Sequence, residues 1–283
     1  MATHSLQPLD ADADASLETL AIARSDGVLR VTLNRPALRN AMSLKMVDEL
    51  RAVLARAEAR GDVRVIVLRG AGGHFCAGAD LQDMALARQR ETAAKTGADS
   101  DATAAANARF GGLCVAFART GIATVAVLEG TVMGGGLGLA CVADVALAAT
   151  GARLRLPETS LGLVPAQIAA FLVERVGPSQ ARRLAVTGGT LSAAQALAIG
   201  LVHEVHDDAA LDTALAATLA QILRCAPGAI AATKQLMAHA ARMPASELVD
   251  DAARIFARAA RGPEGIEGTA AFLQKRAPGW ATA

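Results

Sequence analysis

Two runs of apolar residues, each closed by a glycine, constrain the fold of this chain most strongly. They are VRVIVLRG (63–70) and IATVAVLEG (122–130). A strand that is apolar along its whole length has to be covered on both faces. Both runs therefore predict buried strands in a sheet that lies between layers of helix.

Other segments predict further strands around these two. GVLRVTLN (27–34) alternates apolar and polar residues, which is typical of a strand. VALAA (145–149) and RLRLPE (153–158) are short and apolar enough to be strands as well. Ser43 can cap a helix, and that helix carries its apolar residues on one face. The residues of this face are Met46, Val47, Leu50, Val53 and Leu54.

The pattern becomes helical after about residue 165, where Gly-Pro, Gly-Gly and single prolines follow one another at helix-sized intervals. We therefore expect an α/β fold in which a helical part follows a mixed core. The expected organisation is a solvated tail at 1–20, a core with the active site at 21–205 and a helical C-terminal segment at 206–283. The polar, alanine-rich residues 82–111 predict either a helix with a mobile loop or a lid, and the sequence does not decide between them.

Composition excludes several classes of function. Aromatic residues make up 2% of the chain and tyrosine is absent, so no base-stacking surface for nucleic acid is expected. The net charge of +1 argues against a polyanion-binding protein. The acidic N-terminus does not resemble a targeting signal and no uninterrupted membrane span is expected, so we predict a cytoplasmic protein. The four cysteines form no CxxC pair, which indicates buried free thiols in a reducing compartment.

Several familiar motifs are incomplete. GGGLG (134–138) is not a dinucleotide-binding sequence, because Cys141 stands where the third glycine is needed. Neither a GxSxG nucleophile motif nor a phosphate-binding P-loop occurs. HEVH (203–206) lacks the spacing of a zinc-binding helix, and in a strand His203 and His206 would point to opposite faces. No metal site is predicted.

Two glycine-bearing turns remain, and each leads from an extended run into the start of a helix. They are FCAGADL (75–81), in which Asp80 can cap the helix, and VMGGGLGL (132–139). Backbone N–H groups at a helix N-terminus are free and favour negative charge. Two such groups that converge on one oxygen would form an oxyanion hole. Alternatively, both segments are only tight turns.

Five segments, taken in order, resemble successive motifs of the crotonase superfamily, which includes the enoyl-CoA hydratases and isomerases. The segments are LNRPALRNAMS (33–43), HFCAGADL (74–81), EGTVMGGGLGLACVADVALA (129–148), LPETSLGLVP (156–165) and EGTAAFLQKRAPGW (267–280). The resemblance extends from about residue 20 to the end of the chain. It implies a spiral of β-β-α repeats, followed by a helical C-terminal segment that assembles trimers or dimers of trimers.

The resemblance also implies an active site. Ala77 and Gly135 would donate N–H groups to a thioester oxygen, and Glu158 matches a catalytic glutamate of the family. Without the resemblance, Glu158 could equally be a solvated loop residue or an early-helix charge. The substrate-binding positions that it implies are Ala37, Arg39, Gly78, Ala79, Asp80, Leu81, Gly134, Gly138, Pro157, Leu163 and Lys275.

Gly138 departs from the family pattern, because the hydratases usually carry a second glutamate at this position. One carboxylate, Glu158, would then carry all the proton transfer, and Gln167 could help to orient the water. LGLVPAQIAAFLVERVG (161–177) resembles hydratases of branched substrates such as methylglutaconyl- or isohexenylglutaconyl-CoA. Arg39, Lys275 and Arg276 are candidates to hold coenzyme A, or else are solvated surface charges.

The resemblance leaves five reactions or roles open. Hydration of a branched 2-enoyl-CoA is the leading hypothesis, and double-bond isomerisation is its nearest competitor. Thioester hydrolysis and decarboxylation would use the same oxyanion hole, and a crotonase-fold binding protein without catalysis is the alternative from another class. Coenzyme A would be part of the substrate, so no separate cofactor is expected.

Overall fold

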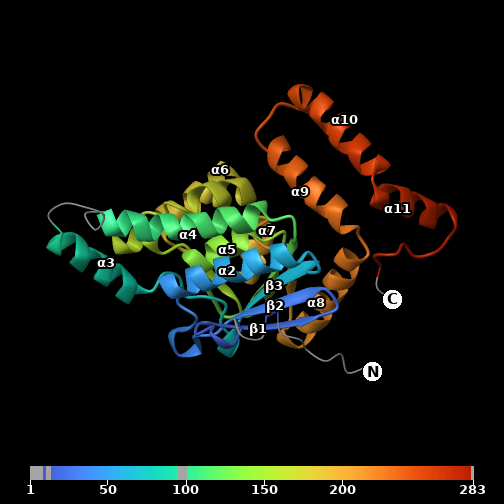
Figure 1. Ribbon diagram of the computed structural model, residues 1–283. Helices are drawn as coiled ribbons and strands as arrows, with labels where there is room; N and C mark the ends of the chain where they lie inside the picture. The colour runs from blue at the N-terminus through green and yellow to red at the C-terminus, as the bar shows by residue number, and fades with distance from the viewer. Residues whose placement is uncertain (1–8, 11–13, 95–100, 282–283) are drawn as a thin grey trace.

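The sheet that the apolar runs predict forms the centre of the protein (Figure 1). A computed structural model describes residues 9–10, 14–94 and 101–281. In this part of the chain, a larger sheet has the strand order β1-β2-β3-β4-β6-β9 and a smaller one has the order β5-β7-β8. The strands of the larger sheet are β1 (Leu20–Ser25), β2 (Val28–Leu33), β3 (Val65–Gly70), β4 (Ala123–Leu128), β6 (Val145–Ala149) and β9 (Glu204–His206). Those of the smaller sheet are β5 (Thr131–Met133), β7 (Arg153–Arg155) and β8 (Thr190–Ser192).

Helices surround this framework. The α-helices are α2 (Leu44–Arg60), α3 (Leu81–Ala93), α4 (Ala102–Arg119), α5 (Gly135–Val142), α6 (Ala169–Thr187), α7 (Ala193–Ala198), α8 (Asp208–Leu223), α9 (Pro227–Ala240), α10 (Ala245–Arg261) and α11 (Pro263–Leu273). Short 3-10 turns are η1 (Pro36–Leu38), η2 (Ala71–Gly73) and η4 (Glu158–Leu161). The prediction of a mixed α/β core with a helical C-terminal part is confirmed.

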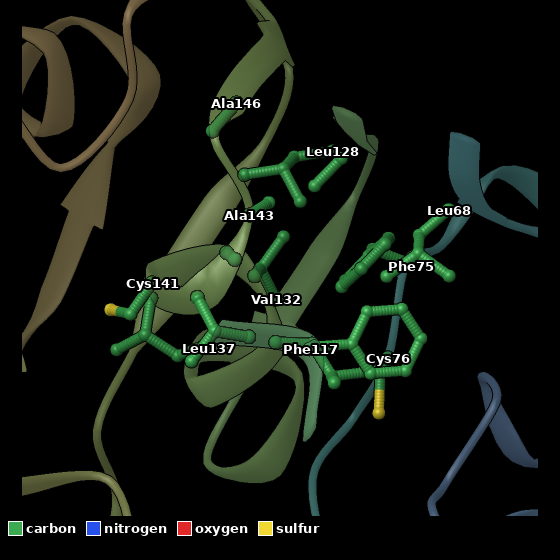
Figure 2. Packing of buried hydrophobic residues seen from close by; sticks show 14 of the residues in the cluster. Leu68, Phe75, Cys76, Phe117, Leu128, Val132, Leu137, Cys141, Ala143 and Ala146 are labelled. Carbon is green, nitrogen blue, oxygen red and sulfur yellow. The ribbon is translucent and has the colours of Figure 1, made fainter. Parts of the chain in front are cut away.

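Both faces of the larger sheet are buried, as the apolar runs require. Ile66 and Leu68 of β3 pack into the core cluster on the side of α2, α4 and α5, while Val65 and Val67 pack into a second cluster against α8. Figure 2 shows part of the first cluster, in which Leu68, Phe75 and Phe117 lie close to the residues that flank α5. Aliphatic side chains therefore fill most of this core.

The first hairpin was not predicted. β1 pairs antiparallel with β2, and the turn between them has positive φ at Asp26 (51°) and Gly27 (74°). Two successive positive φ values favour the turn type that joins tightly paired strands, and an Asp-Gly pair is its usual sequence. That dipeptide in the sequence was the signal for β1. The other strand pairings of the larger sheet are parallel.

Successive β-β-α units position the functional turns. β3 is followed by Cys76, which forms a bridge to Val132 of β5; β4 is followed by β5, and β6 by β7. In each unit, the second extended segment is the one that includes Cys76, β5 or β7. These three segments lie side by side, because Cys76 bridges Val132 of β5 and β5 pairs in parallel with β7. Each piece then leads into a turn and a helix: α3, α5 and η4 with α6. The three turns are therefore stacked at one edge.

Local sequence signals explain the ends of several helices. The Ser43 hydroxyl accepts the Met46 N–H at the start of α2, and the apolar face predicted for this helix is buried. Asp80 caps α3 by accepting the Gln82 N–H. Within α6, Gly177 has φ 74° and directly precedes Pro178. This confirms the interruption that the Gly-Pro pair predicts. Of the segment 82–111, α3 and α4 are ordered helices, while 95–100 lies outside the described residues.

The two ends of the chain differ from expectation. Leu9 is 2% exposed and packs into the core, so a solvated tail is wrong at this residue, whereas 1–8 and 11–13 lie outside the described residues. At the other end, α8 packs on the sheet and α9 contacts the body through Ile230 and Lys234, whereas α10 and α11 extend away from it (Figure 1). In the described chain, no single helix is long and apolar enough to cross a membrane; α8 and α9 pass that test only as a pair bent by 97°.

Candidate active site

Three turns lie side by side where the segment at Cys76, β5 and β7 end. Cys76 donates its N–H to Thr131 O (3.0 Å), and Met133 donates its N–H to Cys76 O (2.9 Å). Gly134 in turn donates its N–H to Arg155 O (3.1 Å). These bonds bring the turn at 77–80, the turn at 134–135 and the turn at 157–158 side by side. The edge therefore holds the predicted glycine turns and Glu158 in one place.

The predicted donor role of Ala77 is wrong. Its N–H is already donated to Arg39 O (2.9 Å), so it is not available to a ligand. The next N–H on the same side of the extended segment is that of Ala79, which is exposed and has no acceptor in the described part of the chain. Gly78, with φ 95°, turns the backbone between these two residues. Ala79 was predicted only as a substrate-binding residue.

Gly135 supplies the second free N–H. It is the first residue of α5, and its N–H has no acceptor among the described residues, as expected at a helix N-terminus. The preceding Gly134 has φ 46° and ψ −117°, a conformation that favours glycine. A Cβ atom on Gly134 would lie 3.5 Å from Gly78 Cα, so the two turns are in van der Waals contact. The free N–H groups of Ala79 and Gly135 thus belong to adjoining turns.

The Glu158 carboxylate lies against the same glycine. Its Oε1 is 3.0 Å from the position that a Cβ atom on Gly134 would occupy. The side chain is half-buried, and its Oε2 has no hydrogen-bond partner within the described ranges. Burial raises the pKa of Glu158 above its ordinary value and outweighs the lowering effect of its own backbone N–H. An unpaired carboxylate with a raised pKa is suited to act as a general base and acid.

Apolar side chains crowd the position of Gly138. It is buried in α5, and a Cβ atom there would lie 3.1 Å from both Phe110 Cζ and Ile168 Cγ1. Phe110 also lies close to Gly135, because a Cβ on Gly135 would be 3.4 Å from its Cζ. Two apolar side chains therefore fill the place of the usual glutamate. Gln167 donates from Nε2 to Asn107 Oδ1 (2.8 Å), which links its loop to α4.

The other predicted binding residues lie in three groups. Asp80 is buried, caps α3 and pairs with Arg35 (2.8 Å), which explains its presence without a ligand. Ala37 and Arg39 are exposed on and beside η1, and Leu81 is exposed at the first turn of α3. Pro157 and Leu163 flank η4, where the Leu163 N–H is donated to Glu158 O (2.9 Å).

The two C-terminal cations follow α11 and lie outside the three turns. Lys275 is exposed just after α11, in the segment that extends away from α5 (Figure 1). Arg276 forms an ion pair with Glu267, with Nη1 to Oε1 at 2.6 Å. Arg276 is therefore engaged in holding the C-terminal segment together.

The remaining predicted groups have structural roles or differ from expectation. Asp144 Oδ2 accepts the Thr124 N–H (2.7 Å) and the Lys234 ammonium (2.7 Å), so this carboxylate satisfies a backbone group. Three cysteines are buried as expected, but Cys225 is exposed. Among the described residues, no group of three or more acidic, histidine or cysteine side chains is arranged to hold a metal ion. A cleft of about 170 Å³ lies between α3 and α4 in the 82–111 segment.

Known proteins resemble this chain over most of its length. The model of one family, described as enoyl-CoA hydratase/isomerase, matches residues 23–283. The 2,3-dehydroadipyl-CoA hydratase of Escherichia coli is 31% identical over 93% of this chain and 98% of its own length. The structure titled Pseudomonas aeruginosa AtuE is 53% identical with a TM-score of 0.88 over 94% of this chain and all of that one. An enoyl-CoA hydratase/isomerase from Marinobacter aquaeolei is 45% identical with a TM-score of 0.88, over 93% of this chain and 99% of that one.

The burial of Glu158 predicts a stability change on its replacement. Its folded-state pKa is raised, so folding is favoured when the carboxyl is protonated and is disfavoured as pH rises through that pKa. Glu158→Gln should therefore raise the melting temperature well above pH 4.5 and lose this advantage below it. Thermal unfolding at two pH values measures the effect. Glu174→Gln, at an exposed position of α6, is the control and should show neither change; a Glu158→Gln protein less stable than wild type at high pH would contradict the prediction.

Proposed function

The chain belongs to the enoyl-CoA hydratase/isomerase family, and on this premise we propose that it adds water to a branched 2-enoyl-CoA. The chain is an enzyme with hydratase-like activity on acyl-CoA. The observation that supports the proposal most directly is the juxtaposition of an unpaired, half-buried Glu158 carboxylate with the adjoining turns that carry two free N–H groups.

The proposed oxyanion hole consists of the Ala79 and Gly135 N–H groups. A thioester oxygen gains negative charge as an enolate forms, so fixed donors stabilise the transition state more than the ground state. The α5 macrodipole adds positive potential at Gly135. Phe110 covers Gly135 from the apolar side, and a water-poor environment strengthens these interactions.

Glu158 is proposed to be both base and acid. It takes a proton from water as the water oxygen attacks the β-carbon, and electrons of the double bond move onto the thioester oxygen. The same carboxyl then returns the proton to the α-carbon, so one group completes the addition. The apolar contacts around Gly138 support a mechanism with a single carboxylate. Gln167 lies on the loop next to Ile168, and its assistance in orienting the water stays a prediction.

The branched substrate is proposed from the segment 161–177 together with Gly138. Methylglutaconyl- or isohexenylglutaconyl-like acyl groups are the class that we propose. Isomerisation is the runner-up, because Glu158 could move a proton between two carbons without water. Hydrolysis and decarboxylation would need the same hole, while the free N–H groups and the carboxylate disfavour a non-catalytic binding protein.

Two replacements of Gly135 distinguish the effect of losing its N–H group from the effect of adding a side chain. Gly135→Pro removes the N–H at the first position of a helix, where proline is tolerated. Activity should fall about 10²–10³-fold, as for loss of one oxyanion donor. The matched control is Gly135→Ala, which keeps the N–H and places its Cβ 3.4 Å from Phe110 Cζ, an ordinary contact. Steady-state kinetics on both variants tests the hole, and normal turnover by a folded Gly135→Pro protein would remove Gly135 from the mechanism.

Replacing Glu158 tests the proton transfer and the reaction type together. Glu158→Gln should lower kcat by at least about 10²–10⁴-fold while ligand binding persists. A panel of straight and branched enoyl-CoAs, incubated with wild-type enzyme in heavy-oxygen water and followed by mass spectrometry, identifies the acyl group and the chemistry. Hydration places the label in the product, whereas isomerisation does not. Full activity in Glu158→Gln would contradict both reactions.

We also propose a homotrimer, or a dimer of trimers, assembled through the C-terminal helices. α10 has no buried residue, and Phe256 is 75% exposed. On α11, Phe272 is 83% exposed. Large apolar side chains at this exposure favour contact with another subunit. In such an assembly Lys275 would hold the coenzyme A of a neighbour, and Arg39 that of its own chain. The expected cytoplasmic location stays a prediction.

Charge on the exposed apolar face should dissociate the assembly. Phe272→Glu is expected to reduce the mass in solution, measured by light scattering after size exclusion, and to weaken coenzyme A binding measured by calorimetry. Thr269→Glu is a control on the same helix, at a partly polar position whose hydroxyl bonds Gly265 O. A monomeric wild-type protein that still binds coenzyme A tightly would exclude the sharing of Lys275.

A further inference from the structure

The position of the Glu158 carboxylate depends on the turn that carries it. No side chain of the described residues bonds to this carboxylate, and Oε2 has no partner there. η4 begins at Glu158, and Gly162, with φ 71°, ends it. Any displacement of this short turn would therefore move the carboxylate relative to Gly134 and Gly135.

Arg155 contacts both sides of the site. It is the last residue of β7, and its carbonyl accepts the Gly134 N–H (3.1 Å) at the glycine turn. Its side chain reaches the other turn, where Nη2 donates to Ser160 Oγ (3.2 Å). Its Nε donates to Gly188 O (2.8 Å), the carbonyl of the residue that ends α6. One residue thus joins the oxyanion turn, η4 and α6.

Ser160 carries the constraint back to Glu158. Its Oγ donates to Pro157 O (2.6 Å), which closes the turn directly before Glu158. The Thr159 hydroxyl adds a second anchor, because it donates to Ala185 O (2.7 Å) on α6. The chain of bonds from Arg155 through Ser160 to Pro157 therefore reaches the residue adjacent to the carboxylate.

The Arg155 guanidinium donates to neutral oxygens and forms no ion pair with Glu158. Burial is the cause that raises the pKa of Glu158, and no neighbouring charge contributes to it. The charged or titratable side chains on the elements packed around η4 are Arg153 and Arg155 on β7, Asp80 paired with Arg35 beside the 77–80 turn, Cys141 on α5, and Glu174, Arg175, Arg182 and Arg183 on α6. Arg155 can thus hold the turn without neutralising the base.

We propose that Arg155 is a positioning residue, which fixes the Glu158 carboxylate relative to the free N–H groups of Ala79 and Gly135. This inference rests on the proposed role of Glu158. It assigns to Arg155 a task beyond strand pairing: its main chain sets the oxyanion turn and its side chain sets the acid–base turn. A rigid connection of this kind is needed because displacement of a catalytic group by about 1 Å can cost about 100-fold in rate.

The test replaces the guanidinium and keeps the main-chain bond. Arg155→Met should lower kcat about 10-fold or more while KM changes less than about 2-fold, because the group acts on the chemical step through Glu158. A loosened turn admits water to the carboxylate, so the acidic limb of the kcat/KM profile should move to lower pH. A purely structural role would not move this limb in a protein that stays folded.

Arg153→Met is the matched control on the same strand. Arg153 is exposed, and its Nη1 donates to Gly151 O (3.2 Å) and Ala152 O (3.0 Å), away from η4. Its kinetics and pH profile should equal those of wild type. Arg155→Lys keeps the charge but lacks the two-armed donor group, so it should restore the rate only in part.

Two further results decide the proposal. If Arg155→Met does not fold, Ser160→Ala tests the same connection, and it should shift the limb in the same direction with a smaller loss of kcat. A folded Arg155→Met or Ser160→Ala enzyme with the wild-type rate and pH limb overturns the proposal. Failure of the proposed function has a different signature, because Glu158→Gln would then retain activity, whatever Arg155→Met does.

Discussion

The site depends on the lateral pairing of three extended segments, which are the segment at Cys76, β5 and β7. Cys76, β5 and β7 are joined by backbone bonds, so the turns that follow them cannot separate without breaking the smaller sheet. Gly134 is central to this packing. A side chain there would lie 3.0 Å from the Glu158 carboxylate and 3.5 Å from Gly78 Cα. Glycine is therefore required both for the φ of 46° and for the close approach of two other turns.

The chemistry follows from what these turns leave unpaired. Folding satisfies most backbone N–H groups, yet Ala79 and Gly135 keep theirs free at the start of two helices. The Glu158 carboxylate beside Gly134 is half-buried, and its Oε2 has no hydrogen-bond partner among the described residues. Burial of a polar group without a compensating hydrogen bond lowers the stability of the folded state. Such a cost is common at functional sites, where an arrangement that suits the transition state is retained at the expense of the folded state.

The protein separates this rigid site from a less integrated C-terminal segment. α8 packs on the sheet through Leu211, Leu215 and Leu219, whereas α10 buries no residue in the described chain. Arg64 connects the two parts by donating to Trp280 O (3.0 Å) and Cys225 O (2.6 Å). Helices with an exposed apolar face gain stability from a partner surface, which accords with a subunit interface there. The three turns and Glu158 lie on the body of the protein and not on those helices.

The sequence by itself determined the elements whose signals are local. Continuous apolar runs specified β3 and β4, Ser43 and Asp80 specified the starts of α2 and α3, and the ordered glycine motifs indicated both turns and the family. Tertiary structure alone decided which N–H groups are free. Ala77 and Ala79 are two residues apart in one turn, but Arg39 O lies opposite only the first. The availability of a donor depends on a segment distant in sequence, and so do the filling of the Gly138 site by Phe110 and Ile168 and the link from Arg155 to Gly188. No local pattern encodes these contacts, because they exist only once separate β-β-α units lie side by side.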